Sequence, residues 1–197
     1  MNLLRLLAVG ALAAWPSIPI FFVQVHAKPT VWRRLGSSAY FLILLEWAPV
    51  ALAIIVFQDF LLGMKLRLGI LSWLGWAVML MGVILHTWTG KLLGWKALIG
   101  YSELKPTMVR QELVTKGPFS VIRHPTYSAH TLMFVGIFFM TGFLATGLLA
   151  ILDLVTSYFL IIPLEERELL SRFGEDYSNY KQSVPKFFPR ILEHKER

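Results

Sequence analysis

Long apolar runs separated by polar, Lys- and Arg-rich segments dominate the chain. The first three runs cover residues 6–25, 39–57 and 68–88. Each is close to the roughly 20 residues that a helix needs to cross the hydrocarbon core of a bilayer. The pattern therefore predicts membrane-spanning helices rather than the core of a soluble domain.

The first run has a second interpretation, as a cleavable signal peptide. Arg5 would be its charged start, and Val25-His26-Ala27 a possible cleavage site. The apolar part is longer than the hydrophobic region of an ordinary signal peptide. We therefore interpret it as a membrane helix, which Pro16 and Pro19 should kink.

The last apolar run, residues 129–164, is too long for one crossing. As a single helix it would measure about 54 Å, whereas a crossing needs about 30 Å. We expect the chain to fold back between residues 141 and 147, which gives spans 129–143 and 146–163. The sequence thus predicts one all-α integral membrane domain over residues 1–197, with about five transmembrane helices and a polar tail, residues 164–197.

Five crossings would put the link 28–38, the segment 89–127 and the tail on one side of the membrane. That side would hold 16 of the 19 Lys and Arg residues, so the positive-inside rule predicts that segment 89–127 and the C-terminus are cytoplasmic. The same arrangement accounts for the net charge of +7, so no nucleic-acid partner is expected. The absence of cysteine excludes thiolate metal sites and a thiol nucleophile, and no metal site is predicted.

The composition agrees with a membrane protein, because 56% of the residues are hydrophobic, against roughly 45–50% in soluble domains. Segment 89–127 is also too long to be an idle connection in so compact a chain. Within it, Gly117-Pro118 marks a turn, and Pro125 suits the first position of a helix. Arg123, His124 and Tyr127 would then lie at a helix N-terminus, which favours anionic groups.

Two separated motifs carry a resemblance to a known family. The first runs from Glu112 to Phe119 (ELVTKGPF) and continues with RHPTY at residues 123–127. The second is LEERELL at residues 164–170, followed by FGEDY at 173–177, Tyr180 and Val184-Pro185. Together they resemble the isoprenylcysteine carboxyl methyltransferase family, whose wider group includes membrane phospholipid methyltransferases. The resemblance covers roughly residues 75–190.

The resemblance implies an S-adenosylmethionine-dependent membrane methyltransferase that acts on a lipid or lipidated acceptor. Its cofactor site would be formed by segment 89–127 and the C-terminal helix. The family's cofactor contacts fall on Gln111, Glu112, Leu113, Val114, Phe119, His124, Pro125, Thr126, Tyr127 and Glu165. The family usually has His at the position of Gln111 and Tyr at the position of Phe119.

The chemistry of these residues agrees with the implied cofactor. Glu165 would pair with its ammonium group, and His124 with the N–H groups of the helix start would hold its carboxylate. Tyr127 and Phe119 offer aromatic faces. Arg123 is a candidate catalytic residue, with an interfacial anchor as the alternative role.

The acceptor side departs from the family pattern. Members that methylate a carboxylate carry an Arg four residues before the Glu that matches Glu165, whereas this chain has Ile161, a candidate substrate-binding position. A prenylcysteine carboxylate, a phospholipid amine and another lipophilic nucleophile all remain possible acceptors. An amine would have to lose a proton, for which Glu166, a second candidate catalytic residue, or His130 are candidates.

A different class of function also has to be considered. Glu46 and Asp153 lie within predicted spans, where an acid is a functional hypothesis by default. They could serve a non-catalytic membrane protein such as a small transporter. Alternatively, both are protonated and hydrogen-bonded between helices.

Overall fold

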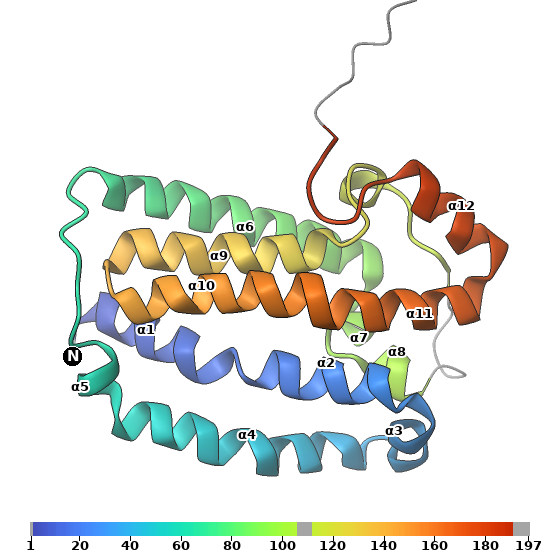
Figure 1. Cartoon of the computed structure of the whole chain (residues 1–197), viewed down its shortest axis with the longest axis horizontal. Helices are drawn as coiled ribbons and strands as arrows, with labels where there is room; N and C mark the ends of the chain where they lie inside the picture. Colours follow the sequence, from blue (N-terminus) through green and yellow to red (C-terminus); the bar gives the residue numbers. More distant parts are fainter. Residues whose placement is uncertain (1, 106–111, 191–197) are drawn as a thin grey trace, which may run out of the picture.

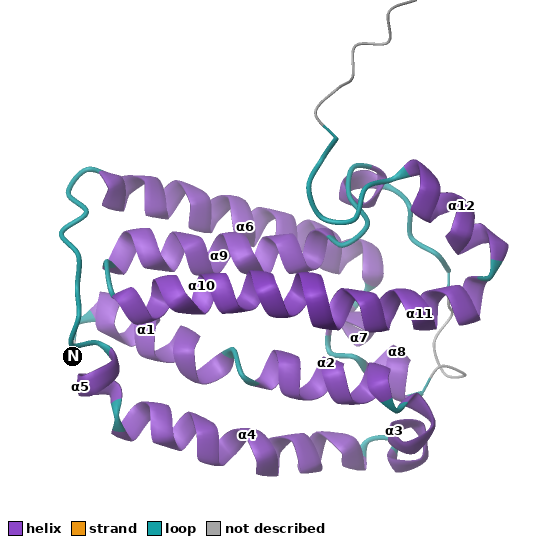
Figure 2. Ribbon diagram, in the orientation of Figure 1, coloured by secondary structure: helices purple, strands orange, loops and turns teal. Residues whose placement is uncertain are grey.

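The computed structural model describes residues 2–105 and 112–190, and within these ranges it contains helices and no strands (Figure 2). The longer apolar helices are α1 (Leu3–Ala14), α2 (Ser17–Ala27), α4 (Ser38–Val56), α6 (Leu71–Leu93), α9 (Pro125–Thr141) and α10 (Leu144–Thr156). The remaining elements are α3 (Pro29–Leu35), α5 (Gln58–Leu61), α7 (Trp95–Leu98), α8 (Tyr101–Leu104), the 3₁₀ helix η2 (Gly117–Ser120), the π-helical turn η3 (Ser157–Ile161), α11 (Ile162–Phe173) and α12 (Glu175–Ser183).

Four helical segments in the described ranges are long and apolar enough to cross a membrane. They are Leu3–Ala27, Ser38–Val56, Leu71–Leu93 and Leu144–Phe173. A fifth long helix, α9, has 17 residues and packs between α6 and α10 (Figure 1). The predicted all-α membrane bundle is confirmed, and the chain is a multi-pass membrane protein.

The helices run roughly side by side, so the connections gather at two ends of the bundle (Figure 1). One end, which we call the basic end, carries α3, α7, α8, α11 and α12. The opposite end carries α5 and the loop that precedes α6. The sequence predicts that the link 28–38, the segment 89–127 and the tail lie on one side of the membrane. The described parts of all three lie at the basic end.

Proline and glycine shape the two ends of the bundle. The first apolar segment breaks between α1 and α2 at Pro16, in agreement with the predicted kink. The chain turns back between α9 and α10 at Gly142, whose φ of +70° is unfavourable for other residues. A Cβ there would lie 2.4 Å from the carbonyl oxygen of Leu66, so the tight approach of that loop also requires glycine.

The last long helix does not end at Pro163, where the predicted span ends, but continues through α11 to Phe173. The π-helical turn η3 immediately precedes the proline, and the N–H of Ile162 bonds to the carbonyl of Ser157. Proline lacks an N–H and its ring needs extra room in a helix, which a widened turn provides. The charged residues of α11 are therefore rigidly joined to the membrane helix.

Close helix packing fixes the position of α9 against α6. A Cβ on Gly136 would lie 2.6 Å from the backbone nitrogen of Met79, and one on Gly75 would lie 2.5 Å from that of Met140. Small residues of this kind let membrane helices approach closely. The outer faces expose large apolar side chains, among them Phe41, Leu52, Trp73 and Leu80, as expected of surfaces that contact lipid.

Candidate functional site

The residues of the first motif lie where the chain enters α9 at the basic end. The 3₁₀ helix η2 begins at Gly117, which has a φ of +58° and lies against Trp88 of α6. Pro125 occupies the first turn of α9, as predicted, and is fully buried. His124 directly precedes it, so the imidazole is placed at the N-terminus of a 17-residue helix.

A C-terminal strap, residues 184–190, closes over this entrance. The N–H of Arg123 donates to the carbonyl of Pro185 at 2.8 Å, and the N–H of His124 donates to that of Lys186 at 3.2 Å. The hydroxyl of Tyr180 in α12 donates to the carbonyl of Phe119 at 2.6 Å. Backbone hydrogen bonds therefore hold the first motif and the tail together.

A buried ion pair reinforces the same junction. Both Arg123 and Glu166 have side chains only 7% exposed, and the guanidinium donates to Oε1 of Glu166 from Nε at 3.0 Å and Nη2 at 2.6 Å. Arg123 also donates to the carbonyls of Lys181, at 3.0 Å, and Val184. The Nζ of Lys181 lies 2.8 Å from Oε2 of Glu166. The two predicted catalytic residues thus bond mainly to the protein itself, and their catalytic role stays a prediction.

His124 faces two carboxylates of α11. Its Nδ1 lies 3.5 Å from Oε2 of Glu165, and its Nε2 lies 3.3 Å from Oε1 of Glu166. Burial alone would lower the pKa of His124, but the two carboxylates outweigh this effect and raise it above its ordinary value. A positively charged imidazole is therefore favoured at the N-terminus of α9.

Two buried polar atoms near the start of α9 make no hydrogen bond within the described residues. They are Oγ1 of Thr126 and Oε2 of Glu165, and the latter lies only in the 3.5 Å ion pair with the imidazole of His124. A buried polar atom without a partner costs about 1–3 kcal/mol, so native proteins retain few of them. An acceptor oxygen beside a cationic imidazole suits a ligand with both a positive and a negative group, such as an α-amino acid moiety.

The aromatic and apolar residues predicted for the site are buried. Tyr127 is buried, with its ring 6.1 Å from that of His124 and 6.3 Å from that of Phe22. Phe119 is also buried. Ile161 is 1% exposed and belongs to the same apolar cluster as Tyr127.

The rest of the first motif is less enclosed. Leu113 and Val114 are half-buried, and Glu112 is exposed. Gln111 lies outside the described residues.

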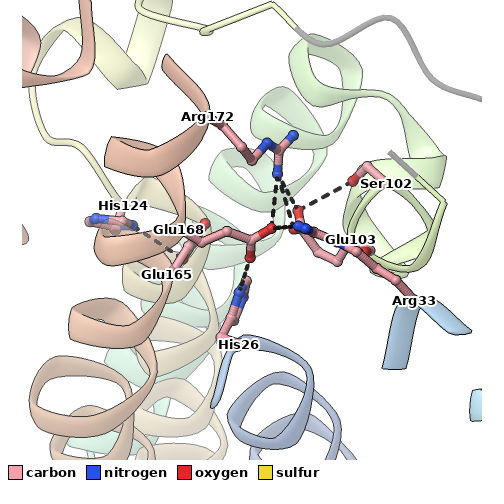
Figure 3. Close-up of polar contacts among 8 residues, drawn as sticks. All are labelled: His26, Arg33, Ser102, Glu103, His124, Glu165, Glu168 and Arg172. Carbon is pink, nitrogen blue, oxygen red and sulfur yellow. Dashed lines mark hydrogen bonds and ion pairs between the residues drawn. The ribbon is translucent and has the colours of Figure 1, made fainter. Parts of the chain in front are cut away.

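A second polar network, one turn further along α11, was not anticipated from the sequence (Figure 3). His26 at the end of α2 places Nδ1 2.7 Å from Oε2 of Glu168, and Arg33 of α3 donates to the other oxygen of that carboxylate. Arg172 donates to Glu103 of α8 at 3.0 Å and lies 3.6 Å from Glu168. Glu168 and Arg172 are four residues apart on the same helix, yet Glu168 is buried because three other elements contact it.

The charges in this network are unevenly compensated. Burial and the nearby Glu168 carboxylate raise the pKa of Glu103 to about 7, although Arg172 opposes the shift. Donor atoms of His26, Glu103 and Glu168 lie within 4.8 Å of one another, close enough for one metal ion to bridge them. Arg33 and Arg172 already pair with these carboxylates, so the arrangement acts as an ion-pair network that fixes α11 against α2, α3 and α8.

Sequence patterns give little signal for this network. His26 and Glu168 are 142 residues apart, so no local spacing connects them. The remaining clue is that several ionisable residues border apolar runs, and the predicted topology places these borders on the same side of the membrane. Pairing partners would have to be inferred from that topology.

The two acids within the apolar segments are hydrogen-bonded between helices, as one interpretation of the sequence anticipates. Asp153 of α10 accepts a hydrogen bond from Nε1 of Trp15 at 3.0 Å and one from Oγ1 of Thr131 at 2.6 Å. Glu46 of α4 accepts one from Gln24 of α2. These contacts give both acids a packing role and do not favour a transporter.

Comparisons with known proteins find methyltransferases among those similar to this chain. A methanethiol S-methyltransferase from Crocosphaera subtropica is 30% identical, over 79% of this chain and 58% of its own length. A protein-S-isoprenylcysteine O-methyltransferase from Schizosaccharomyces pombe is 34% identical over 40% of this chain and 34% of its own length. A cobalt-zinc-cadmium resistance protein from Cupriavidus metallidurans is 39% identical, over 40% and 36%.

The methanethiol S-methyltransferases match most of this chain, but the match spans little more than half of their own length. No solved structure matches it significantly. The family model described as phospholipid methyltransferase matches residues 70–176, which include α6, α9, α10, α11 and the site at their basic end. By this match over more than half of its residues, the chain belongs to the phospholipid methyltransferase family.

Proposed function

We propose that the chain is an integral membrane methyltransferase that uses S-adenosylmethionine to methylate a lipophilic acceptor. One observation carries the proposal: a buried carboxylate oxygen of Glu165 that accepts no hydrogen bond lies 3.5 Å from the imidazole of His124, at the N-terminus of α9. The family and the names of the relatives support methyl transfer as the reaction.

The residues present fit the proposed cofactor. Glu165 would accept from the ammonium of its methionine part, and His124 with the first N–H groups of α9 would hold its carboxylate. Tyr127 and Phe119 would supply apolar aromatic faces. The cofactor brings a methyl group on a sulfonium that a nucleophile attacks in line, so the protein mainly has to hold the reactants and exclude water.

We propose that Arg123 and Glu166 act by positioning. Their pair is buried and bonded to α12 and to the C-terminal strap, so it holds His124 and the strap over the entrance of α9. No side-chain nucleophile is needed, since the acceptor itself attacks the methyl carbon.

The acceptor would enter from the lipid phase. The relatives are named for methanethiol and for a protein S-isoprenylcysteine. On this chain the wall next to Tyr127 is formed by Ile161, Ile162 and Phe187, which carry no charge. We further propose that the basic end faces the cytoplasm, because most Lys and Arg residues lie there.

Binding of S-adenosylhomocysteine to the detergent-purified chain tests the proposal. Isothermal titration calorimetry should show binding that Glu165→Ala and His124→Ala each weaken by about 10- to 100-fold, the value of a charge-assisted hydrogen bond. Glu175→Gln, an exposed acid of α12, is the matched control and should bind as the parent does.

Size-exclusion chromatography of each variant separates loss of binding from loss of folding. Absence of heat at millimolar S-adenosylhomocysteine with well-folded parent protein would refute the proposed function.

A further inference from the structure

Two histidines that the proposed cofactor site does not use face each other across α6 and α9. The imidazole rings of His86 and His130 have centroids 4.9 Å apart at an interplanar angle of 39°. The helices are close here because Gly82, one turn before His86, would place a Cβ 2.9 Å from the backbone nitrogen of Met133. The contact between the histidines is therefore fixed by backbone packing.

The Nδ1 atoms of both rings are buried and have no hydrogen-bond partner within residues 2–105 and 112–190. A neutral imidazole has one N–H and one lone pair, so each orphaned nitrogen leaves a donor or an acceptor unpaired. Two unpaired nitrogens on adjacent rings in an apolar bundle indicate a place where a polar group of a ligand enters.

The pair lies next to the proposed methyl-transfer site, on its inner side. The ring of His130 is 6.3 Å from that of Tyr127, which in turn lies 6.1 Å from His124. A ligand that reached His130 from the bilayer would therefore approach the cofactor segment along α9.

Among the described residues, the helices that carry or border the pair offer little fixed charge to hold a charged acceptor. Neither α9 nor α10 contains Lys or Arg, and α6 has only Lys91, in its last turn. Asp153 of α10 is occupied by Trp15 and Thr131, and α1 contributes only Arg5, at the opposite end. A carboxylate would lack a cation here. An ammonium would compete with the cofactor for Glu165, the acid that the proposed function assigns to the cofactor's own ammonium, whereas a neutral thiol needs only a proton acceptor.

We propose that His130, whose ring packs against that of His86, is the general base that takes the proton of a lipophilic thiol acceptor. The S–H bond breaks and its proton moves to a ring nitrogen of His130, while the thiol sulfur forms a bond to the methyl carbon. The bond from that carbon to the sulfonium sulfur breaks, and both electrons stay on the sulfonium sulfur. The inference rests on the proposed function, since it assigns the acceptor side of the same reaction.

Thiols resembling cysteine have a pKa of about 8.5 and are mainly protonated at neutral pH, so removal of the base should matter. The probes are dodecanethiol, which is protonated at pH 7, and 4-nitrothiophenol, which is already ionised. His130→Asn should lower kcat/KM for dodecanethiol by about 10²- to 10⁴-fold, the usual contribution of general base catalysis, and for 4-nitrothiophenol by less than 10-fold.

The matched control is Thr87→Ala, an exposed neighbour whose hydroxyl bonds only to the carbonyl of Val83 in its own helix; it should leave both rates unchanged. Binding of S-adenosylhomocysteine to every variant is measured in parallel, so failure of the cofactor site is distinguished from failure of the base. Three results would each overturn the inference. The first is an equal loss on both thiols, and the second is unchanged dodecanethiol turnover in His130→Asn. The third is a parent protein that binds the cofactor but methylates only a prenylcysteine carboxylate.

Discussion

At the scale of single residues, burial decides which charged groups hold the molecule together. The pair of Arg123 and Glu166 is almost completely buried, so each charge depends on the other. Glu175, on the exposed side of α12, is solvated instead. Acids near the same end of the molecule therefore differ greatly in their contribution to stability.

Glu166→Gln should lower the free energy of unfolding by about 3–5 kcal/mol, because it leaves the buried guanidinium of Arg123 without its anion. Glu175→Gln should change it by less than about 0.5 kcal/mol. Thermal unfolding in detergent, followed by intrinsic tryptophan fluorescence, compares the two. Equal midpoints would show that the ion pair contributes no net stability.

Glu103 gives stability a pH dependence. Its pKa is about 7 in the folded chain, above the ordinary value, so the folded state binds the proton more tightly than the unfolded state. The associated stability is complete at pH values below the ordinary pKa and is lost as pH rises towards 7 and beyond. We expect a loss of roughly 3 kcal/mol between pH 5 and pH 8 from this group.

Glu103→Gln should remove most of that pH dependence. Unfolding midpoints measured from pH 5 to pH 8 should become flatter than in the parent, whereas the control Asp176→Asn, an exposed acid, should keep the parental slope. A parental slope in Glu103→Gln would place the titrating group elsewhere.

At the scale of elements, the contact between α6 and α9 organises the bundle. Glycines on both helices allow an approach at which a single extra methyl group would collide with backbone atoms. This contact places α9, and with it His124, Tyr127 and His130, at a fixed height relative to α6.

Gly136→Ala should therefore destabilise the chain by about 1–3 kcal/mol, since its Cβ would lie 2.6 Å from the backbone nitrogen of Met79. Gly10→Ala is the matched control, because Gly10 also lies in a helix and a Cβ added there would have no heavy atom within 4 Å. That change should be neutral or stabilising by up to about 1 kcal/mol. Similar thermal midpoints for the two variants would contradict this account of the packing.

At the scale of the whole molecule, charge and apolar length together predict an orientation. The absence of cysteine makes it testable, because any introduced cysteine is the only thiol in the chain. Gln182→Cys lies at the basic end and Met64→Cys at the opposite end, both at exposed positions. In intact cells, a membrane-impermeant maleimide should label Met64→Cys and leave Gln182→Cys unlabelled until the membrane is permeabilised. The reverse pattern would invert the proposed orientation.

Much of this architecture could be predicted because it depends on local sequence. Apolar run length predicts the membrane helices, proline and glycine predict the break at Pro16 and the turn near Gly142, and the motif brings His124 and Glu165 together. The continuation of the last helix through Pro163 could not be predicted, since it depends on a widened turn that has no sequence signature. Networks such as His26 with Glu168 depend on the packing of distant segments, which spacing alone does not specify.

The C-terminal strap has a consequence for how the protein is made. Arg123 and His124 hydrogen-bond to the backbone of Pro185 and Lys186, which the ribosome adds some 62 residues later. At about 5–20 residues per second, this gap corresponds to roughly 3–12 seconds of translation. A nascent chain that has just completed α9 therefore still lacks α10, α11 and the strap. The site is completed only after residues 184–190 have been added, so a growing chain has no finished pocket with which to bind a ligand before its membrane helices have been synthesised.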